Sequence, residues 1–471
     1  MTQQKTEFGE LAAQIWAMAG GAPEAAEALA VTGPRTVLPS VFDVTGLATA
    51  SVTAAALAAA EYGAARNSAA VPAVRTDSRG ACVAFAAEGL FAPDGWSLPE
   101  IWDPVAGNYR ARDGWIRLHT NYAYHRAAVS RVLKADDRAA VQAAVSEWTA
   151  GDLESAVVAE GGCAAAMHDR DEWLASAAGA ATGGDQALSV AEEPMAGDRG
   201  GAAARAENPA GQPYAGVRVL DLTRVIAGPM CTRFLAAYGA DVLRLDPPGF
   251  AEVPALLPET TAGKRTAGVD LTAADGRAAF EQLVAGADVL VSGLRADALT
   301  GLGYDDAALR TLNPALIIAS LNAYGWDGPW RGRRGFDSLV QMSCGIAAAG
   351  AAATAADRPV PLPVQALDHA TGYLLAAAVG RALTVRLTRQ AVSRVRASLT
   401  GTANLLWSLP RPAGHGSDQP PMPRREDIPL VPARTVWGPA ARAPLPGAID
   451  GVTPALAVEA GPLGRHQPAW W

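Results

Sequence analysis

The sequence predicts an α/β protein with a large parallel-sheet domain and a smaller α+β domain. Its 471 residues are too many for one ordinary hydrophobic core. Half of the residues are hydrophobic but only 6% are aromatic, which is typical of closely packed helices with small side chains. Short apolar runs alternate with helically spaced segments after residue 216. This alternation predicts parallel strands joined by right-handed crossovers.

The elements of the large domain can be read in order. A strand at 217–221, a helix over 230–238 and a strand at 242–246 form the first unit. The same pattern then repeats along the chain. It predicts a helix at 274–285, a strand at 288–291, a helix at 305–312 and a strand at 316–321.

The rest of the chain divides by composition. An Ala-rich helix at 48–62, an aromatic block at 102–125 and helices over 138–158 predict a separate α+β module at 1–175. Residues rich in Gly, Ala, Asp and Pro predict a linker at 176–212. The large domain then covers 213–409, and a Pro-rich segment at 410–471 is expected to wrap over the surface.

Charge and cysteine content narrow the classes of function. A net charge of -8 argues against nucleic acid or an anionic membrane as partner, because both need a broad basic surface. The cysteines Cys82, Cys163, Cys231 and Cys344 lie far apart, and no His or Cys spacing predicts a metal site. A polar start at 1–10 and the lack of a long apolar span predict a cytoplasmic protein.

Two short segments resemble each other and indicate an internal repeat. Val41-Phe-Asp-Val-Thr-Gly46 and Ala366-Leu-Asp-His-Ala-Thr-Gly372 each place an Asp before Thr-Gly and an apolar helix. The alternative is coincidence, because Asp near Thr-Gly is a common helix start in Ala-rich sequences.

Asp368, in the second segment, has two possible roles. At the start of a helix it can accept backbone N–H bonds as an N-cap. The same place stabilises a carboxylate as the anion and leaves it available as a nucleophile.

The loop at 223–229 follows the first strand and opens the next helix, which is where open α/β sheets bind anionic ligands. It lacks GxGxxG, so a dinucleotide dehydrogenase is poorly supported, and a simple strand-to-helix turn is the alternative. Basic side chains near strands and turns are candidates to neutralise phosphates, or else are solvated surface groups. They are Arg244, Lys264, Arg265, Arg295, Arg333 and Arg334.

One further segment and two histidines are candidates for a role in the site. The segment at 335–341 is suited to an acyl pocket, although Asp337 within it reads as the cap of a helix. His119 and His125 have no Ser or Cys partner that the sequence places, so structural roles are expected for both.

Eight motifs together resemble the class III CoA-transferases, the CaiB/BaiF family, over residues 216 to about 406. They are Val219-Leu-Asp-Leu-Thr-Arg-Val-Ile-Ala-Gly-Pro229, Tyr238-Gly-Ala-Asp-Val-Leu-Arg-Leu-Asp246, Gly263-Lys-Arg265 with Asp270-Leu271, Asp288-Val-Leu-Val291, Leu312-Asn-Pro314, Ala323-Tyr-Gly325, Gly335-Phe-Asp337 and Asp368-His-Ala-Thr-Gly372.

The resemblance implies a Rossmann-like CoA-binding domain with Asp368 as the nucleophile. It places the loop residues Val225, Ile226 and Ala227 along CoA. It places the basic residues Arg244, Lys264 and Arg265 near the phosphates of CoA. Two departures stand out. Ser292-Gly293 replaces an Asn that family members often carry, and no Gly-rich flap is recognisable.

The order of the segments also departs from the family. Asp43-Val-Thr-Gly46 resembles the nucleophile segment itself, which is then present twice. Tyr109-Arg-Ala-Arg-Asp-Gly-Trp115 resembles a small-domain part that normally follows the nucleophile, yet here it comes first. We therefore expect permuted or fused family segments, with Asp43 a relic or a structural cap.

The implied reaction moves CoA from an acyl-CoA to a carboxylic acid through an aspartyl anhydride and an aspartyl-CoA thioester. Coenzyme A is then a substrate, with no permanently bound cofactor or metal, and the family's interlocked dimers suggest a homodimer. One alternative is a 2-methylacyl-CoA racemase, against which Phe336 counts because the racemases carry His there. The other is a non-catalytic CoA-binding partner subunit.

Overall fold

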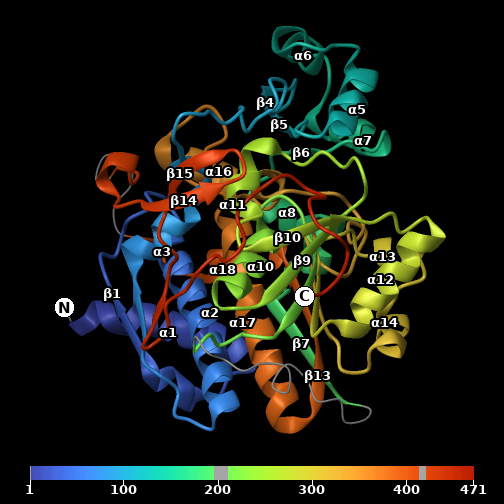
Figure 1. Cartoon of the computed structure of the whole chain (residues 1–471). Coiled ribbons are helices and arrows are strands. Elements are labelled where there is room, and N and C mark those ends of the chain that lie inside the picture. The colour runs from blue at the N-terminus through green and yellow to red at the C-terminus, as the bar shows by residue number, and fades with distance from the viewer. Residues whose placement is uncertain (1, 196–210, 413–420) are drawn as a thin grey trace.

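The large sheet confirms the predicted α/β fold (Figure 1). The structure is a computed structural model that describes residues 2–195, 211–412 and 421–471. Six of the seven strands are parallel, and the edge strand β7 is antiparallel to β13. In spatial order the strands are β10 (Lys264–Gly268), β9 (Asp241–Asp246), β8 (Arg218–Leu222), β11 (Val289–Ser292), β12 (Ile317–Asn322), β13 (Ala391–Ser398) and β7 (Leu188–Pro194).

The predicted strands at 217–221, 242–246, 288–291 and 316–321 correspond to β8, β9, β11 and β12, each displaced by at most one residue. The helices predicted between them are also present. They are α10 (Ala227–Ala237), α12 (Ala274–Gly286) and α14 (Asp306–Leu312).

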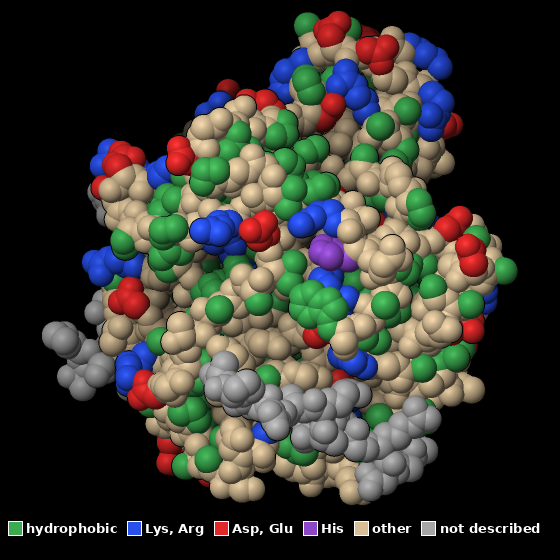
Figure 2. All heavy atoms as spheres, in the orientation of Figure 1, with side chains coloured by type: hydrophobic (Ala, Val, Ile, Leu, Met, Phe, Trp, Pro, Cys, Tyr) green, Lys and Arg blue, Asp and Glu red, His purple; other side chains and the backbone are tan. Residues whose placement is uncertain are grey.

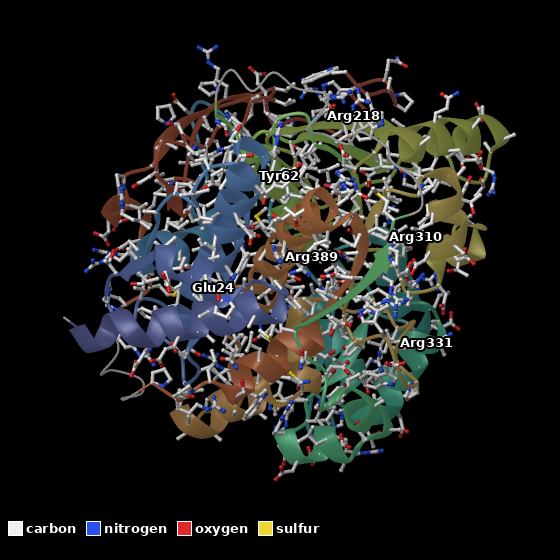
Figure 3. The ribbon with its side chains drawn as sticks, turned by 90° about the horizontal axis from the view of Figure 1, so that it is seen from below. Glu24, Tyr62, Arg218, Arg310, Arg331 and Arg389 are labelled. Atoms are coloured by element: carbon white, nitrogen blue, oxygen red, sulfur yellow. The ribbon has the colours of Figure 1, made fainter. Side chains whose placement is uncertain are left out.

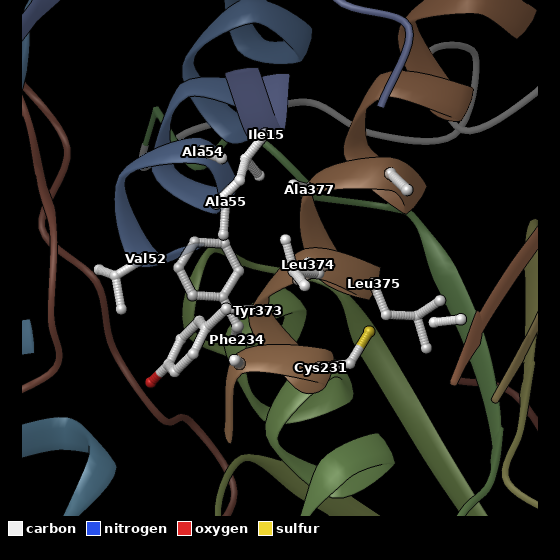
Figure 4. Packing of buried hydrophobic residues seen from close by; sticks show 14 of the residues in the cluster. Ile15, Val52, Ala54, Ala55, Cys231, Phe234, Tyr373, Leu374, Leu375 and Ala377 are labelled. Carbon is white, nitrogen blue, oxygen red and sulfur yellow. The ribbon is translucent and has the colours of Figure 1, made fainter. Parts of the chain in front are cut away.

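Two long helices pack side by side in the centre of the main core. They are α2 (Val44–Asn67) and α17 (Ala366–Arg389), each of 24 residues. Small side chains allow the close approach, since a Cβ on Gly380 would lie 2.8 Å from the Cβ of Ala58. Figure 4 shows Val52, Ala54 and Ala55 of α2 opposite Tyr373, Leu374 and Ala377 of α17, with Ile15 of α1 (Thr2–Met18) beside them.

The surroundings of these helices match the repeat seen in the sequence. Both end at a left-handed residue, Ser68 with φ 51° and Gln390 with φ 53°. Each is followed by a strand and then a helix that starts with a side-chain cap. The units are α2, β2 (Val74–Asp77) and α3 (Ser78–Phe85), and α17, β13 and α18 (Leu399–Ser408).

A small lobe stands away from this body at the top of Figure 1. It has its own hydrophobic core and a three-stranded antiparallel sheet. Its elements are β4 (Gly107–Arg110), β5 (Trp115–Leu118), β6 (Ala164–Ala166), α5 (Ala123–Leu133), α6 (Arg138–Val145) and α7 (Ala150–Ala159).

Shorter elements complete the fold. The helices are α4 (Ala87–Leu90), α8 (Arg170–Ala175), α9 (Ala177–Thr182), α11 (Leu257–Thr260), α13 (Ala298–Gly301), α15 (Asp337–Ser343) and α16 (Ile346–Thr354), with 3-10 turns at Pro23–Ala28, Pro254–Leu256 and Arg425–Asp427. The strands are β1 (Leu29–Thr32), β3 (Ala92–Pro93), β14 (Val431–Thr435), β15 (Gly438–Arg442) and β16 (Ala448–Ile449).

The structure draws the domain boundaries differently from the sequence prediction. Residues 1–175 do not form one module, because α1 and α2 belong to the main core while 107–166 form the lobe. Part of the predicted linker is ordered structure, since α9 and β7 lie within 176–195, and the rest of it at 196–210 lies outside the described residues. Seen from below, α1 lies across the main body near Tyr62 and Arg389 (Figure 3).

The described part of the C-terminal segment crosses the body. Strand β15 pairs with β3, and β16 pairs with β2. The indole of Trp470 donates to the Leu283 carbonyl at 3.0 Å and fixes the end of the chain against α12.

Helix α2 is long and apolar enough to cross a membrane by length and composition, but 94% of its most apolar window is buried inside the protein. It therefore serves as a core helix here. The face in Figure 2 carries acidic and basic side chains interspersed with hydrophobic ones, without a broad basic area.

Candidate active site

Asp368 lies in the first turn of α17, where two cavities meet. Its side chain is 7% exposed and lines both of them. The helix reaches this place because Gly372 lies against the start of α10, where an added Cβ would lie 2.4 Å from the Ala227 carbonyl oxygen. The Thr-Gly pair that follows the aspartate therefore brings α17 close to the loop after β8.

We call the first space, of about 310 Å³, the polar cavity. Its lining includes Tyr122, Tyr124, His125, Arg224, Val225, Ala227, Arg295, Arg333, Arg334, Phe336 and Asp368. The second, the apolar cavity, measures about 380 Å³. Its lining includes Phe85, Glu88, Leu90, Ile101, Trp102, His119, Asn121, Val225, Ile226, Leu256, Phe336, Asp337, Val364, Asp368, Met422 and Pro423.

Asp337 caps the helix that carries Asp368 and leaves the start of its own helix α15 uncapped by a side chain. Its Oδ2 accepts the backbone N–H of Leu367 at 2.8 Å and that of Asp368 at 3.1 Å. The side chain of Gln341 donates to the other carboxylate oxygen. The N-cap position of α17, Gln365, makes no side-chain cap. The sequence-based expectation that Asp337 caps α15 was wrong. The Asp337 carboxylate instead holds the first turn of α17 and so fixes the position of Asp368.

The surroundings of Asp368 oppose its ionisation. Burial raises the pKa of this carboxyl well above its ordinary value, and the neighbouring charges of Asp337 and Glu88 raise it further. Burial also raises the pKa of Asp337. Among the described residues, no group donates a hydrogen bond to the Asp368 carboxylate. The expected stabilisation by free amides at the helix start is absent because Asp337 already accepts them.

The loop after β8 holds an unusual backbone conformation beside Asp368. Val225 has φ 63°, which is rare for a β-branched residue and indicates strain retained at a site. Its N–H donates to Glu252 Oε2 at 3.0 Å, and Tyr122 donates to the other oxygen of Glu252 at 2.7 Å. Val225 lines both cavities, Ala227 the polar one and Ile226 the apolar one, so the predicted loop residues come together around Asp368.

The structure places Arg244, Lys264 and Arg265 away from both cavities. None of the three lines either cavity, and each is nearly or fully buried. Arg244 pairs with Asp246 at 2.8 Å and Glu252 at 3.0 Å.

The other two basic groups are occupied in the same way. Burial lowers the pKa of Lys264 to about 8, and its ammonium bonds to Asp221 at 3.1 Å and to the Pro229 carbonyl at 2.9 Å. Arg265 pairs with Asp241 at 2.8 Å and donates to the Ala469 carbonyl. Arg244 thus stabilises the loop after β8 through Glu252, and Lys264 stabilises it through the Pro229 carbonyl. Arg265 binds the C-terminal segment.

Other guanidinium groups face the polar cavity instead. Arg224 lies 3.8 Å from the centre of the Phe250 ring, and Arg333 pairs with Glu154 at 2.7 Å. The side chains of Arg295 and Arg334 make no hydrogen bond or ion pair with any residue that the structure describes. Sequence reasoning had included Arg295, Arg333 and Arg334 among its wider candidates, but the resemblance selected Arg244, Lys264 and Arg265 instead.

His119 lies in the apolar cavity with its ring stacked on Phe336, the ring centres 3.8 Å apart. Burial lowers the pKa of His119 well below its ordinary value, so the imidazole is neutral. Its Nδ1 is buried without a hydrogen-bond partner among the described residues. His125 lines the polar cavity and lies 3.4 Å from the Cys163 sulfur.

Glu88 is a further carboxylate that sequence reasoning missed. It comes from α4, far from α17 in the sequence, and lines the apolar cavity. Its Oε2 lies 3.1 Å from Nε2 of His369, the residue after Asp368. Burial alone would raise the pKa of Glu88, but the charge and hydrogen bond of His369 lower it below its ordinary value. No local motif marks Glu88, because only folding brings α4 beside α17.

Asp43, the counterpart of Asp368 in the repeat, caps α2. Its carboxylate accepts the Gly46 N–H at 2.8 Å and pairs with Arg35 at 3.4 Å. It lines neither cavity. Its role is therefore structural, and within the described ranges no group of three or more His, Cys, Asp or Glu side chains is arranged to hold a metal ion.

Residues 214–432 match the sequence profile of CoA-transferase family III. An acetyl-coenzyme A transferase of Hypoxylon pulicicidum is 33% identical over 192 residues, 40% of this chain and 32% of the relative. A probable fatty acyl-CoA transferase of Mycobacterium tuberculosis is 33% identical over 232 residues, 45% of this chain and 57% of the relative. A crystal structure of the latter aligns with a TM-score of 0.38 at 31% identity, covering 42% of this chain and 57% of that chain. The chain thus spans only about a third to somewhat over half of the length of these relatives.

Proposed function

We propose that the chain transfers CoA from an acyl-CoA to a carboxylic acid, with Asp368 as the nucleophile. The observation that carries the proposal is that this one carboxyl group lines both cavities. A thioester has a polar, phosphate-bearing side and an acyl side. A carboxylate at the boundary of a cationic and an apolar space suits attack on the carbon that joins them.

The reaction proceeds through covalent intermediates on Asp368. Its carboxylate attacks the thioester carbonyl, a C–O bond forms, and the C–S bond breaks to give an acyl anhydride and CoA thiolate. The thiolate then attacks the aspartyl carbonyl, which releases the carboxylate of the donor and leaves an aspartyl-CoA thioester. An acceptor carboxylate takes the CoA by the reverse steps. First-turn amides of α10 at Ala227 and Gly228 are the candidate donors to the oxyanions.

The phosphate-bearing part of CoA is assigned to the polar cavity. Arg295 and Arg334 have no protein partner among the described side chains, so their charges are available to an anion. Arg224 lines the same space. These residues replace Arg244, Lys264 and Arg265 in the proposed binding of phosphates.

Covalent trapping tests the proposal directly. The protein is incubated with a panel of acyl-CoA donors, treated with hydroxylamine or borohydride, and examined by peptide mass spectrometry. Modification at Asp368 is expected, with none in Asp368→Asn. Asp357→Asn is the matched control, because Asp357 is exposed and lines neither cavity. An unmodified Asp368 across the panel would favour the non-catalytic CoA-binding reading.

A racemase-like proton transfer is the second candidate function, and His119 is the observation that favours it. Phe336 cannot take a proton, but His119 brings a neutral imidazole against that ring and into the cavity that Asp368 lines. Incubation of a 2-methylacyl-CoA in deuterated water tests this function. Deuterium at the α-carbon that disappears in His119→Asn would support it, and its absence in the wild type would exclude it.

Assembly is tested separately. The family resemblance predicts a homodimer, and light scattering of the purified chain gives the mass of the particle. A monomer that is modified at Asp368 would show that one chain carries a complete site.

A further inference from the structure

The apolar cavity combines a hydrophobic wall with carboxyl groups and has no Lys or Arg among the described residues that line it. Phe85, Leu90, Ile101, Trp102 and Val364 provide carbon surface. Its ionisable side chains other than His119 are the carboxyl groups of Glu88, Asp337 and Asp368, and no Lys or Arg of the described chain lines it.

Basic side chains stand behind this lining, among them His369 beside Glu88. Arg117 lies over the Trp102 ring, 4.9 Å from its centre, and bonds to Asn108. Arg233 pairs with Glu259 at 2.8 Å. An acyl group inside the cavity therefore meets carboxyl groups, while neither guanidinium group lines the cavity.

Glu88 is the carboxyl group that lies apart from the reacting centre. His369 contacts only one of its oxygens, Oε2. The other oxygen, Oε1, is buried and has no hydrogen-bond partner among the described residues. The side chain is 10% exposed, so water screens its charge poorly.

We propose that the apolar cavity accepts an uncharged, apolar acyl group, and that Glu88 determines this specificity by excluding acyl groups that end in a second carboxylate. The inference rests on the proposed function, because it takes the reacting carbon to lie at Asp368. The carboxyl group of a monocarboxylic acceptor stays at the boundary between the cavities and enters no deeper. A terminal carboxylate would have to lose its water beside the unpartnered Oε1 of Glu88, because His369 contacts only the other oxygen and no Lys or Arg of the described chain lines the cavity.

Binding of two thioether analogues tests the inference without any turnover. S-hexyl-CoA and S-(5-carboxypentyl)-CoA differ only at the chain end, and isothermal titration calorimetry gives the ratio of their affinities. The wild type is expected to bind the hexyl analogue at least about tenfold more tightly. Glu88→Gln is expected to reduce this ratio several-fold by improving binding of the carboxylated analogue.

Two further variants protect the test against a folding defect. Glu100→Gln removes the same charge from an exposed position and is expected to leave the ratio unchanged. Ile101→Arg places a cation in the lining and is expected to favour the carboxylated analogue. Because each ratio is measured within one variant, a loss of active protein cancels.

Three results would overturn the inference: equal or tighter binding of the carboxylated analogue by the wild type, ratios unchanged in both Glu88→Gln and Ile101→Arg, or no binding of either analogue. The trapping experiment reports independently on the reaction. Selective binding without modification at Asp368 would reject the proposed transferase reaction and retain the proposed binding preference. Modification at Asp368 without selective binding would retain the reaction and reject the preference.

Discussion

At the scale of single residues, the site depends on carboxyl groups held close together in a buried place. Asp337 is fixed by two backbone N–H groups of the helix that carries Asp368. Asp368 receives no such bonds, so its proton is held by burial and by the charge of its neighbours. A carboxyl group of this kind is a poor anion but a more basic nucleophile once it is ionised.

Replacement of the nucleophile should abolish turnover. In Asp368→Asn we expect kcat to fall by about 10⁴-fold or more, because no other carboxyl group of the described residues lines both cavities. Steady-state assays of CoA transfer measure the loss, with circular dichroism to show that the fold is retained. Activity near the wild-type level would remove Asp368 from the mechanism.

The raised pKa of Asp368 predicts the direction of the pH dependence. Only the ionised carboxylate attacks, so kcat/KM should rise with pH and level off above the pKa of Asp368, well above the ordinary value of about 4 for this side chain. In Asp337→Asn one opposing charge is gone, and the rise should move to lower pH. A profile that stays in place would show that the two carboxyl groups are not coupled.

The same shift affects folding stability. Because the folded pKa of Asp368 lies above the unfolded one, its contribution to stability is present at low pH and is lost as pH rises through the folded value. Asp368→Asn should therefore increase the free energy of unfolding by roughly 1–3 kcal/mol at pH 8 and change it little at pH 4. Thermal melts at both pH values measure the difference, and an equal effect at both would contradict the shift.

At the scale of elements, the close contact between α17 and α10 positions Asp368, the proposed nucleophile. Gly372 lies where the two helices touch, and the loop at Val225 passes beside them. Local signals in the sequence predicted the strands and helices of the large domain, because hydrophobic period and composition are properties of neighbouring residues. The resemblance predicted that Asp368 lies beside the loop. Glu88, Asp337 as a cap and the pairing of Arg244 could not be predicted from the sequence, because each depends on which distant segment becomes a neighbour.

Gly372→Ala tests this contact. The new Cβ would lie 2.4 Å from a backbone oxygen, so one helix must shift. We expect a loss of about 1–3 kcal/mol in unfolding free energy, together with reduced kcat as Asp368 moves. The control is Gly151→Ala in α7, where no atom lies within 4 Å of the added Cβ and a small gain of about 0.5–1 kcal/mol is expected. Equal effects of the two changes would reject the contact as a positioning device.

At the scale of the whole molecule, segments from both ends of the chain build one core. Helix α2 packs along α17, and β7 joins the large sheet beside β13. The sequence indicated the repeat that these helices form, but it predicted an independent N-terminal module. A hydrophobic pattern identifies which face of a helix or strand is buried. It does not identify the element against which that face packs.

A divided chain should therefore stay together. We expect fragments 1–195 and 211–471, made in the same cells with a tag on one, to purify as a complex, since α17 alone would expose the apolar face that α2 covers. Affinity purification and a single melting transition test this. A stable, monomeric 211–471 fragment would contradict the shared core.

One wall of the apolar cavity comes from Phe85, Glu88 and Trp102, while Asp368 and the loop at Val225 lie more than a hundred residues further along the chain. The residues proposed for substrate choice and the residue proposed for reactivity are thus encoded in separate stretches of the gene. A chimaera that takes its first half from a homologue should inherit the acyl preference of that donor and keep the recipient's chemistry, so new specificities become accessible by recombination without alteration of the nucleophile.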